Sequence, residues 1–141
     1  MPVRTADARW EGSIREGKGT MRVGSGAFEG QYSFSSRFEE GEGTNPDELI
    51  GAALAGCFSM ALSGNLTRAG HPPTSISTNA KVHVEQLNGG FGITTIELQT
   101  QGEVPGIDEA GFKEQAELAS KNCPVSKALT GVNIKLEARL A

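Results

Sequence analysis

Residues 45–70 of the chain read NPDELIGAALAGCFSMALSGNLTRAG, and this stretch predicts one long helix around which the rest of the fold is organised. Asn45 is a good N-cap, and Pro46 suits the first helical position because it has no N–H group to leave unpaired. Gly70 and the two prolines that soon follow it end the helix. Nearly every position between residues 49 and 62 is apolar or small, so we expect a helix that is buried on every side, with Cys57 at its middle.

Outward from this helix, alternating apolar residues predict strands on both sides. Before it, residues 8–23 predict a hairpin that turns at residues 16–19 and points Trp10 and Ile14 inward, and residues 28–38 predict a strand with Arg37 near its end. After it, two strands at residues 74–87 and 91–104 flank an Asn88-Gly89 turn, and the shift of phase between Ile93 and Ile96 indicates a bulge or a twist.

The last third of the chain predicts a second helix and a final strand. Asp108 is placed to cap a helix over residues 109–121 that buries Phe112, Ala116 and Ala119. A further turn or two of helix follows at residues 124–129, and residues 132–140 alternate as a strand. The predicted fold class is therefore α+β, with mostly antiparallel strands.

Composition narrows the function classes. With 141 residues, the chain is expected to form one domain over residues 1–141. Its net charge of -4 and the lack of any Lys/Arg cluster argue against nucleic acid and anionic membranes as partners. No signal peptide is evident, and Ser59, Ser63 and Asn65 interrupt the central helix, so we expect a cytoplasmic protein without a membrane span. Its two cysteines and two histidines have no metal-ligand spacing, and we expect no metal and no cofactor.

The two cysteines are the candidate nucleophiles, and each also has a plain structural interpretation. Cys57 could be a small core residue, because a thiol in the middle of a helix becomes a stable thiolate only beside a cation. Cys123 precedes Pro124 at the start of a helical segment, where backbone N–H groups favour a thiolate. Electrostatics at helix ends therefore favour Cys123 as the more reactive thiol. Arg37 could be an ordinary surface charge, and Asp47 and Glu48 could simply be carboxylates of a first helical turn.

Four segments taken together resemble one known family. Arg37-Phe38, GTNPDELIGAA at residues 43–53, AGCFSMAL at residues 55–62 and CPVSKAL at residues 123–129 are similar to the OsmC/Ohr family of osmotically inducible and organic hydroperoxide resistance proteins. The similarity extends to WEG at residues 10–12 and VPGID at residues 104–108. The sequence around Cys57 resembles the OsmC branch of this family more than the Ohr branch.

The resemblance implies an intertwined homodimer with active sites at the subunit interface and a thiol peroxidase that reduces organic hydroperoxides and hydrogen peroxide. It implies that Cys57 attacks the peroxide, that Cys123 resolves the sulfenic acid to a disulfide, and that Arg37 activates Cys57. An external dithiol would then reduce the disulfide. The family carboxylate, usually Glu, falls on Asp47, so either the shorter Asp47 pairs with Arg37 or Glu48 takes its place.

Helix geometry adds a hypothesis about the assembly. Residues 47 and 57 of one straight helix are separated by about 15 Å along its axis, so Asp47 cannot reach the Cys57 of its own chain. We expect Arg37 and Asp47 of one subunit to complete the site of the other, unless the helix begins later and the preceding loop folds back.

Two other functions are compatible with these residues. One is a non-enzymatic dimer that binds an apolar ligand and keeps its cysteines as structural or redox-sensing groups. The other is a thiol-dependent hydrolase, which would need a general base near Cys57, and neither His71 nor His83 is suitably placed in the sequence.

Overall fold

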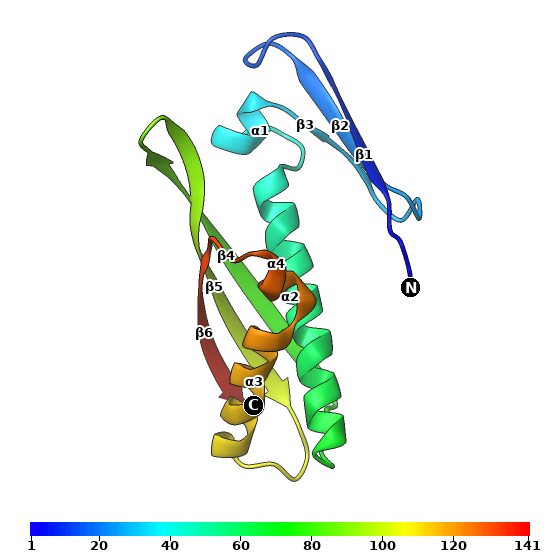
Figure 1. The fold of residues 1–141 in the computed structure, drawn as a ribbon, viewed down its shortest axis with the longest axis vertical. Coiled ribbons are helices and arrows are strands. Elements are labelled where there is room, and N and C mark those ends of the chain that lie inside the picture. The colour runs from blue at the N-terminus through cyan, green and yellow to red at the C-terminus, as the bar shows by residue number, and fades with distance from the viewer. The chain divides into compact units, whose positions relative to one another are not determined.

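The elements follow the order β1–β2–β3–α1–α2–β4–β5–α3–α4–β6 in the computed structural model, which describes residues 1–141 (Figure 1). By its internal contacts the chain divides into two units, Met1–Leu49 and Ile50–Ala141. Each unit contains one three-stranded sheet. The expected single domain over residues 1–141 stays a prediction.

The first unit is built on an antiparallel sheet of β1 (Ala6–Glu11), β2 (Lys18–Val23) and β3 (Glu29–Tyr32), in that order. The rings of Trp10 and Tyr32 contact each other in a tilted arrangement, with their centroids 5.4 Å apart. The predicted hairpin is present as the antiparallel pair of β1 and β2, and Trp10 is half-buried as expected.

Three details of this unit differ from the predictions. The hairpin turn spans residues 12–17 rather than 16–19. Ile14 lies in this turn with 68% of its surface exposed, so its prediction as an inward anchor was wrong. The strand predicted over residues 28–38 ends at Tyr32, and the short helix α1 (Phe34–Phe38) follows it and carries Arg37.

A capping box explains the helix that the alternating pattern missed. Ser33 accepts a hydrogen bond from the Ser36 N–H at 3.1 Å, and the Ser33 N–H donates to Ser36 Oγ at 2.8 Å. This reciprocal pair starts a helix at once. The aromatic side chains at 34 and 38 lie one helical turn apart. A spacing of four residues also fits one face of a strand, and the strand prediction rested on that second interpretation.

The predicted central helix is present as α2 (Pro46–Arg68). Its expected burial on every side was wrong for the chain by itself. One stripe spaced by four residues is fully buried, namely Leu54, Phe58, Leu62 and Leu66, whereas Met60 on the opposite side is 81% exposed. An apolar pattern around a whole helix indicates that all of its faces need apolar contacts, but one sheet can contact only one face of the helix.

By length and composition alone, α2 is long and apolar enough to cross a membrane. Ser59, Ser63 and Asn65 therefore do not exclude a membrane span, although we expected from the sequence that they would. Such a test is also passed by the core helix of a water-soluble domain. In the second unit, the buried stripe of α2 belongs to the main hydrophobic core.

The second unit contains the long hairpin of β4 (Ser75–Leu87) and β5 (Gly90–Glu103), with the predicted tight turn at residues 88–89. The expected bulge is present, because His83 pairs with Thr95 while Val84 pairs with Ile93, which leaves one extra residue in β5. The last strand, β6 (Asn133–Leu140), pairs with β5 in parallel, while all other pairs are antiparallel.

Helices α3 (Glu109–Asn122) and α4 (Pro124–Ala128) connect β5 to β6 and make this parallel pairing possible, because parallel neighbours need a crossover connection. Asp108 caps α3 through the Gly111 N–H at 2.7 Å, as predicted. The predicted inward face is confirmed, since the following side chains are fully buried in one core with the stripe of α2: Phe112, Ala116 and Ala119.

Candidate functional site

The two cysteines, 123 − 57 = 66 residues apart, come together within the second unit. Cys57 lies half-buried in the middle of α2, and Cys123 is fully buried at the junction of α3 and α4. Both are free thiols, and each side chain is close enough to the other to shift its pKa through hydrogen bonding. The fold of the second unit therefore brings the two thiols close to each other.

The start of α4 places Cys123. Cys123 is both the C-cap of α3 and the N-cap of α4, and Pro124 occupies the first position of α4. Its sulfur accepts the Ser126 N–H at 3.4 Å. This is the arrangement in which a cysteine replaces the usual Ser or Asp cap, and backbone N–H groups then stabilise negative charge on sulfur.

The pKa values of the two thiols are shifted in opposite directions. Burial raises the pKa of Cys57, and the hydrogen bond with Cys123 raises it further, against a smaller lowering by the backbone of Val125. Burial also acts to raise the pKa of Cys123, but the hydrogen bonds from Cys57 and from the Ser126 N–H outweigh it, and the net pKa is lowered. The groups of this unit therefore favour the thiolate form of Cys123 over that of Cys57, and no cation is among the groups that shift the pKa of Cys57.

Arg37 and Asp47 form the second predicted pair, within the first unit. Arg37 Nε donates to Asp47 Oδ2 and Arg37 Nη2 donates to Asp47 Oδ1, both at 3.1 Å. The carboxylate is only 9% exposed, whereas the guanidinium side chain is 38% exposed. Two parallel bonds between planar groups fix the orientation of the arginine more firmly than a single contact would.

The structure distinguishes between the two candidate carboxylates. Glu48 accepts a hydrogen bond from the Thr44 hydroxyl at 2.7 Å, and its N–H donates to the side chain of Asn45 at 2.7 Å. Asn45 also donates to the Ser36 carbonyl at 3.1 Å, which ties the start of α2 to α1. Asp47 is therefore the carboxylate that binds Arg37.

The four predicted site residues thus form two pairs, one in each unit: Arg37 with Asp47, and Cys57 with Cys123. Sequence reasoning missed Ser126, which contacts Cys123 through its N–H group. The signal was available, because the residue three positions after an N-cap supplies the N–H that the cap accepts. No cluster of three or more His, Cys, Asp or Glu side chains could hold a metal ion, and the expected lack of a cofactor stays a prediction.

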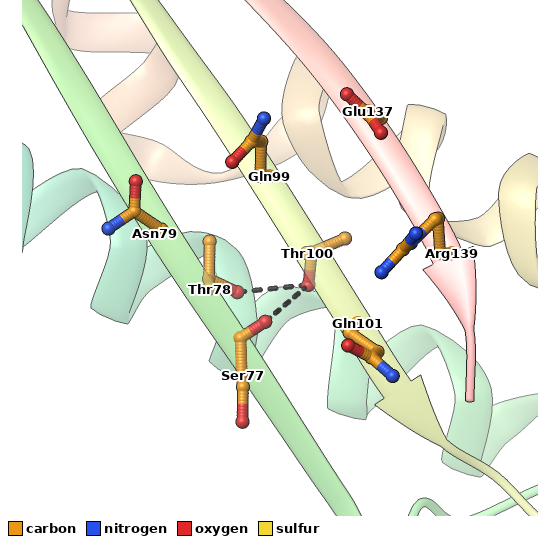
Figure 2. Close-up of a pocket in the computed structure, with 8 residues that line it drawn as sticks. All are labelled: Ser77, Thr78, Asn79, Gln99, Thr100, Gln101, Glu137 and Arg139. Atoms are coloured by element: carbon orange, nitrogen blue, oxygen red, sulfur yellow. Dashed lines mark hydrogen bonds between the residues drawn. The ribbon is translucent and has the colours of Figure 1, made fainter.

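A polar cavity lies elsewhere, on the face of the second sheet whose side chains are mostly exposed (Figure 2). It is lined by Ser77, Thr78, Asn79, Gln99, Thr100, Gln101, Glu137 and Arg139. The hydroxyls of Thr78 and Thr100 are hydrogen-bonded at 3.0 Å beneath it. Its lining contains neither cysteine, so we place the candidate redox chemistry at the thiol pair.

Comparison with known proteins shows which family the chain is similar to. Residues 39–137 match the family described as OsmC-like protein. The chain is 50% identical over 127 residues to Peroxiredoxin OsmC of Escherichia coli (strain K12), covering 89% of each sequence. It is 36% identical over 102 residues to the organic hydroperoxide resistance protein of Xanthomonas axonopodis pv. citri (strain 306), covering 72% of this chain and 69% of the relative.

A solved structure shows the same fold. The organic hydroperoxide resistance protein OhrB of Bacillus subtilis aligns with a TM-score of 0.75 and 25% identity, covering 95% of this chain and 97% of that one. The α+β architecture derived from the strand and helix patterns is thus shared with a protein named for hydroperoxide resistance.

Proposed function

The chain belongs to the OsmC-like protein family, and we propose that it is a thiol-dependent peroxidase that reduces organic hydroperoxides and hydrogen peroxide. The names of its relatives, a peroxiredoxin and organic hydroperoxide resistance proteins, support a role in removing peroxides. The observation that carries the two-cysteine mechanism is the contact between the side chains of Cys57 and Cys123. A thiol pair that can react directly offers a route from a sulfenic acid to a disulfide.

The proposed cycle has three steps. The Cys57 thiolate attacks the distal oxygen of the peroxide, so that an S–O bond forms, the O–O bond breaks and an alcohol or water leaves. Cys123 then attacks the sulfur of the Cys57 sulfenic acid, forming the disulfide and releasing water. An external dithiol reduces this disulfide, because the chain has no further cysteine.

The first step needs a cation that the second unit does not supply to Cys57. Burial raises the pKa of Cys57, so the thiolate is scarce at neutral pH without a positive charge beside it. We assign this charge to Arg37, which Asp47 holds by two hydrogen bonds. Bound in this way, the guanidinium would approach the thiol with one orientation and little further loss of entropy.

We further propose that the protein is a homodimer in which Arg37 serves the Cys57 of the partner subunit. The supporting observation is that α2 is one helix that begins at Pro46, so Asp47 is in its first turn. Ten helical residues rise about 15 Å, which is too far for a carboxylate to reach. The alternative required a helix that begins later, after a loop that folds back, whereas α2 already begins at Pro46.

The central experiment measures turnover of cumene hydroperoxide with a dithiol reductant. Cys57→Ser is expected to abolish turnover, because serine cannot form the sulfenic acid. Cys123→Ser is expected to leave a Cys57 sulfenic acid that a 1,3-dione reagent traps. Ser120→Ala, which removes a hydroxyl near the end of α3, is the control and should keep full activity.

Two outcomes would contradict this assignment. If Cys57→Ser keeps full turnover, Cys57 is not the peroxide-attacking group. If the wild type fails to consume peroxide and its thiols do not label, the alternative of a non-enzymatic dimer that binds an apolar ligand is favoured.

A mixing experiment tests the shared site. Cys57→Ser and Arg37→Gln chains are each expected to be inactive alone. If Arg37 acts across the interface, refolding the two together restores one complete site per heterodimer, and about a quarter of the wild-type activity. If Arg37 acts within its own chain, every site in the mixture lacks one group and no activity returns.

A further inference from the structure

Ser126 is buried beside the reactive thiols with an unpaired hydroxyl. It lies three residues after Cys123 in α4, and only 9% of its surface is exposed. Its Oγ is the single buried side-chain oxygen or nitrogen that has no hydrogen-bond partner in the structure. Because buried polar groups are nearly always paired, an unpaired one calls for a specific explanation.

The position of this hydroxyl points to the Cys123 sulfur. The N–H of the same residue donates to Cys123 Sγ at 3.4 Å, so Ser126 is already held against the sulfur by its backbone. The Ser126 side chain is also one of the groups that lower the pKa of Cys123. The hydroxyl is thus near enough to stabilise a negative charge on sulfur, although it makes no hydrogen bond of normal geometry to the neutral thiol.

We propose that Ser126 is a positioning residue for the second chemical step, in which its hydroxyl donates a hydrogen bond to the Cys123 thiolate. This inference rests on the proposed peroxidase function. In the reduced resting protein the hydroxyl is unpaired, and it gains its partner when Cys123 loses its proton. The Ser126 side chain and its own N–H then hold the sulfur together, aimed at Cys57.

The step that Ser126 assists is the closing of the disulfide. The Cys123 thiolate supplies an electron pair to the Cys57 sulfur, the S–S bond forms and the S–O bond of the sulfenic acid breaks. The departing hydroxide leaves as water by taking up from solvent the proton that Cys123 had released. The strongest influences on Cys123 are burial, Cys57 on α2 and the α4 residues Ser126 and Val125, and no charged side chain is among them. Within one chain, the Ser126 hydroxyl therefore acts on Cys123 without a competing charged side chain.

Hydrogen bonding has two opposite effects on the rate. It increases the thiolate fraction at neutral pH, but it also makes each thiolate a weaker nucleophile, with a Brønsted coefficient of about 0.4–0.5. If Ser126→Ala raises the pKa of Cys123 by about one unit, disulfide closure should slow about threefold at pH values below that pKa and speed up about threefold above it. The two pH–rate profiles should cross.

The test compares Ser126→Ala with Ser120→Ala as a control. The Cys123 pKa is measured by thiolate absorbance in a Cys57→Ser background, and disulfide closure is followed after a single turnover with peroxide. We expect Ser126→Ala to raise the pKa and to give the crossing profile, while Ser120→Ala changes neither. Ser126→Thr, which keeps the hydroxyl, should retain the wild-type profile.

The stability of the reduced protein adds a second readout. Because the hydroxyl has no partner there, Ser126→Ala should leave the unfolding midpoint unchanged or raise it. Uniform slowing at every pH, a wild-type pKa in Ser126→Ala, or an alanine-like profile in Ser126→Thr would overturn the inference. If the wild type shows no peroxide turnover but the pKa still shifts, the proposed function fails while the Ser126–Cys123 contact stands.

Discussion

Arg37 and Asp47 are unequally buried. The energetic cost of breaking their ion pair therefore depends on which of the two charges is left without a partner. The carboxylate is 9% exposed and the arginine side chain 38%. Removing the arginine leaves a buried charge with no cation, which is the costly way to break such a pair.

We predict that Arg37→Ala lowers the free energy of unfolding by about 1–3 kcal/mol. Arg22→Ala is the matched control, because Arg22 forms an ion pair with Asp7 in which the side chains are 56% and 65% exposed, respectively. Exposed pairs contribute little, so the control should change stability by well under about 1 kcal/mol. Urea unfolding measures both, and equal losses would show that burial of Asp47 is not the cause.

Glu97 has a lowered pKa on the exposed face of the second sheet. The hydrogen bond from His83 is the largest cause of the lowering, and the positive charges of His83, Lys81 and Lys135 add to it. The ring Nε2 and the carboxylate oxygen are 2.6 Å apart across β4 and β5. The contact with His83 therefore lowers the pH range over which Glu97 takes up its proton.

We predict that His83→Gln moves the pKa of Glu97 back up towards its ordinary value of 4.5. Since the pKa is lowered in the folded state, the stabilisation is present above the unfolded pKa and is lost as the pH falls through the folded one. Carboxyl NMR titration of the two proteins measures the shift, with Lys18→Gln in the other sheet as the control. No upward shift would contradict the assigned cause.

At the scale of elements, a chain of hydroxyl groups connects α2 to its sheet. Ser59 on α2 is hydrogen-bonded to Thr78 at 2.7 Å, and Thr78 to Thr100 at 3.0 Å. Thr100 also donates to the Ser77 carbonyl at 3.3 Å, as Figure 2 shows. These bonds set the position of the Cys57-bearing helix on β4 and β5 more narrowly than apolar packing alone.

We predict that Thr100→Val destabilises the protein by about 1–2 kcal/mol, because valine keeps the shape but removes a buried hydroxyl from two hydrogen bonds. Thr130→Val, at an exposed position, is the control and should have almost no effect. Chemical unfolding with an unchanged denaturant slope measures the loss. An equal stability of the two variants would mean that the hydroxyl chain adds nothing to apolar packing.

At the scale of the whole molecule, the uncovered side of α2 is the feature that a single chain leaves unexplained. Met60 is 81% exposed beside the small exposed residues Ala52 and Gly56, on the side opposite the buried stripe. Only 28% of the most apolar window of this helix is buried within the chain. The proposed homodimer gives this side a cover.

We predict that Met60→Glu shifts the proposed dimer to monomers, because a carboxylate cannot be buried there without a partner. Leu118→Glu, at a 43% exposed position on α3, is the control and should not change the mass. Sedimentation equilibrium distinguishes the two. Dimers of normal affinity in Met60→Glu would place the interface elsewhere, and peroxide turnover of the monomer would contradict the shared site.

Much of the fold was predictable because its signals are local. Caps and breakers placed α2 and α3 within a few residues, and Asn88-Gly89 together with the phase shift in β5 placed the long hairpin and its bulge. The wrong predictions were the position of the hairpin turn, with Ile14 in it, the α1 segment and the burial of α2. For α1 and α2 a periodic pattern was compatible with two structures, and reciprocal capping bonds or the extent of one sheet decided between them.

The sequence by itself predicted the candidate site residues Cys57, Cys123, Arg37 and Asp47, with Glu48 as the other possible carboxylate, and it determined that a long apolar helix holds one of the thiols. Only the tertiary structure decided that Cys57 and Cys123 are close enough to shift each other's pKa, that Asp47 rather than Glu48 binds Arg37, and that the hydroxyl of Ser126 is buried near the Cys123 sulfur without a partner. The physical reason is that residue type and spacing set local conformation, whereas a contact over 66 residues depends on how the sheet and helices pack.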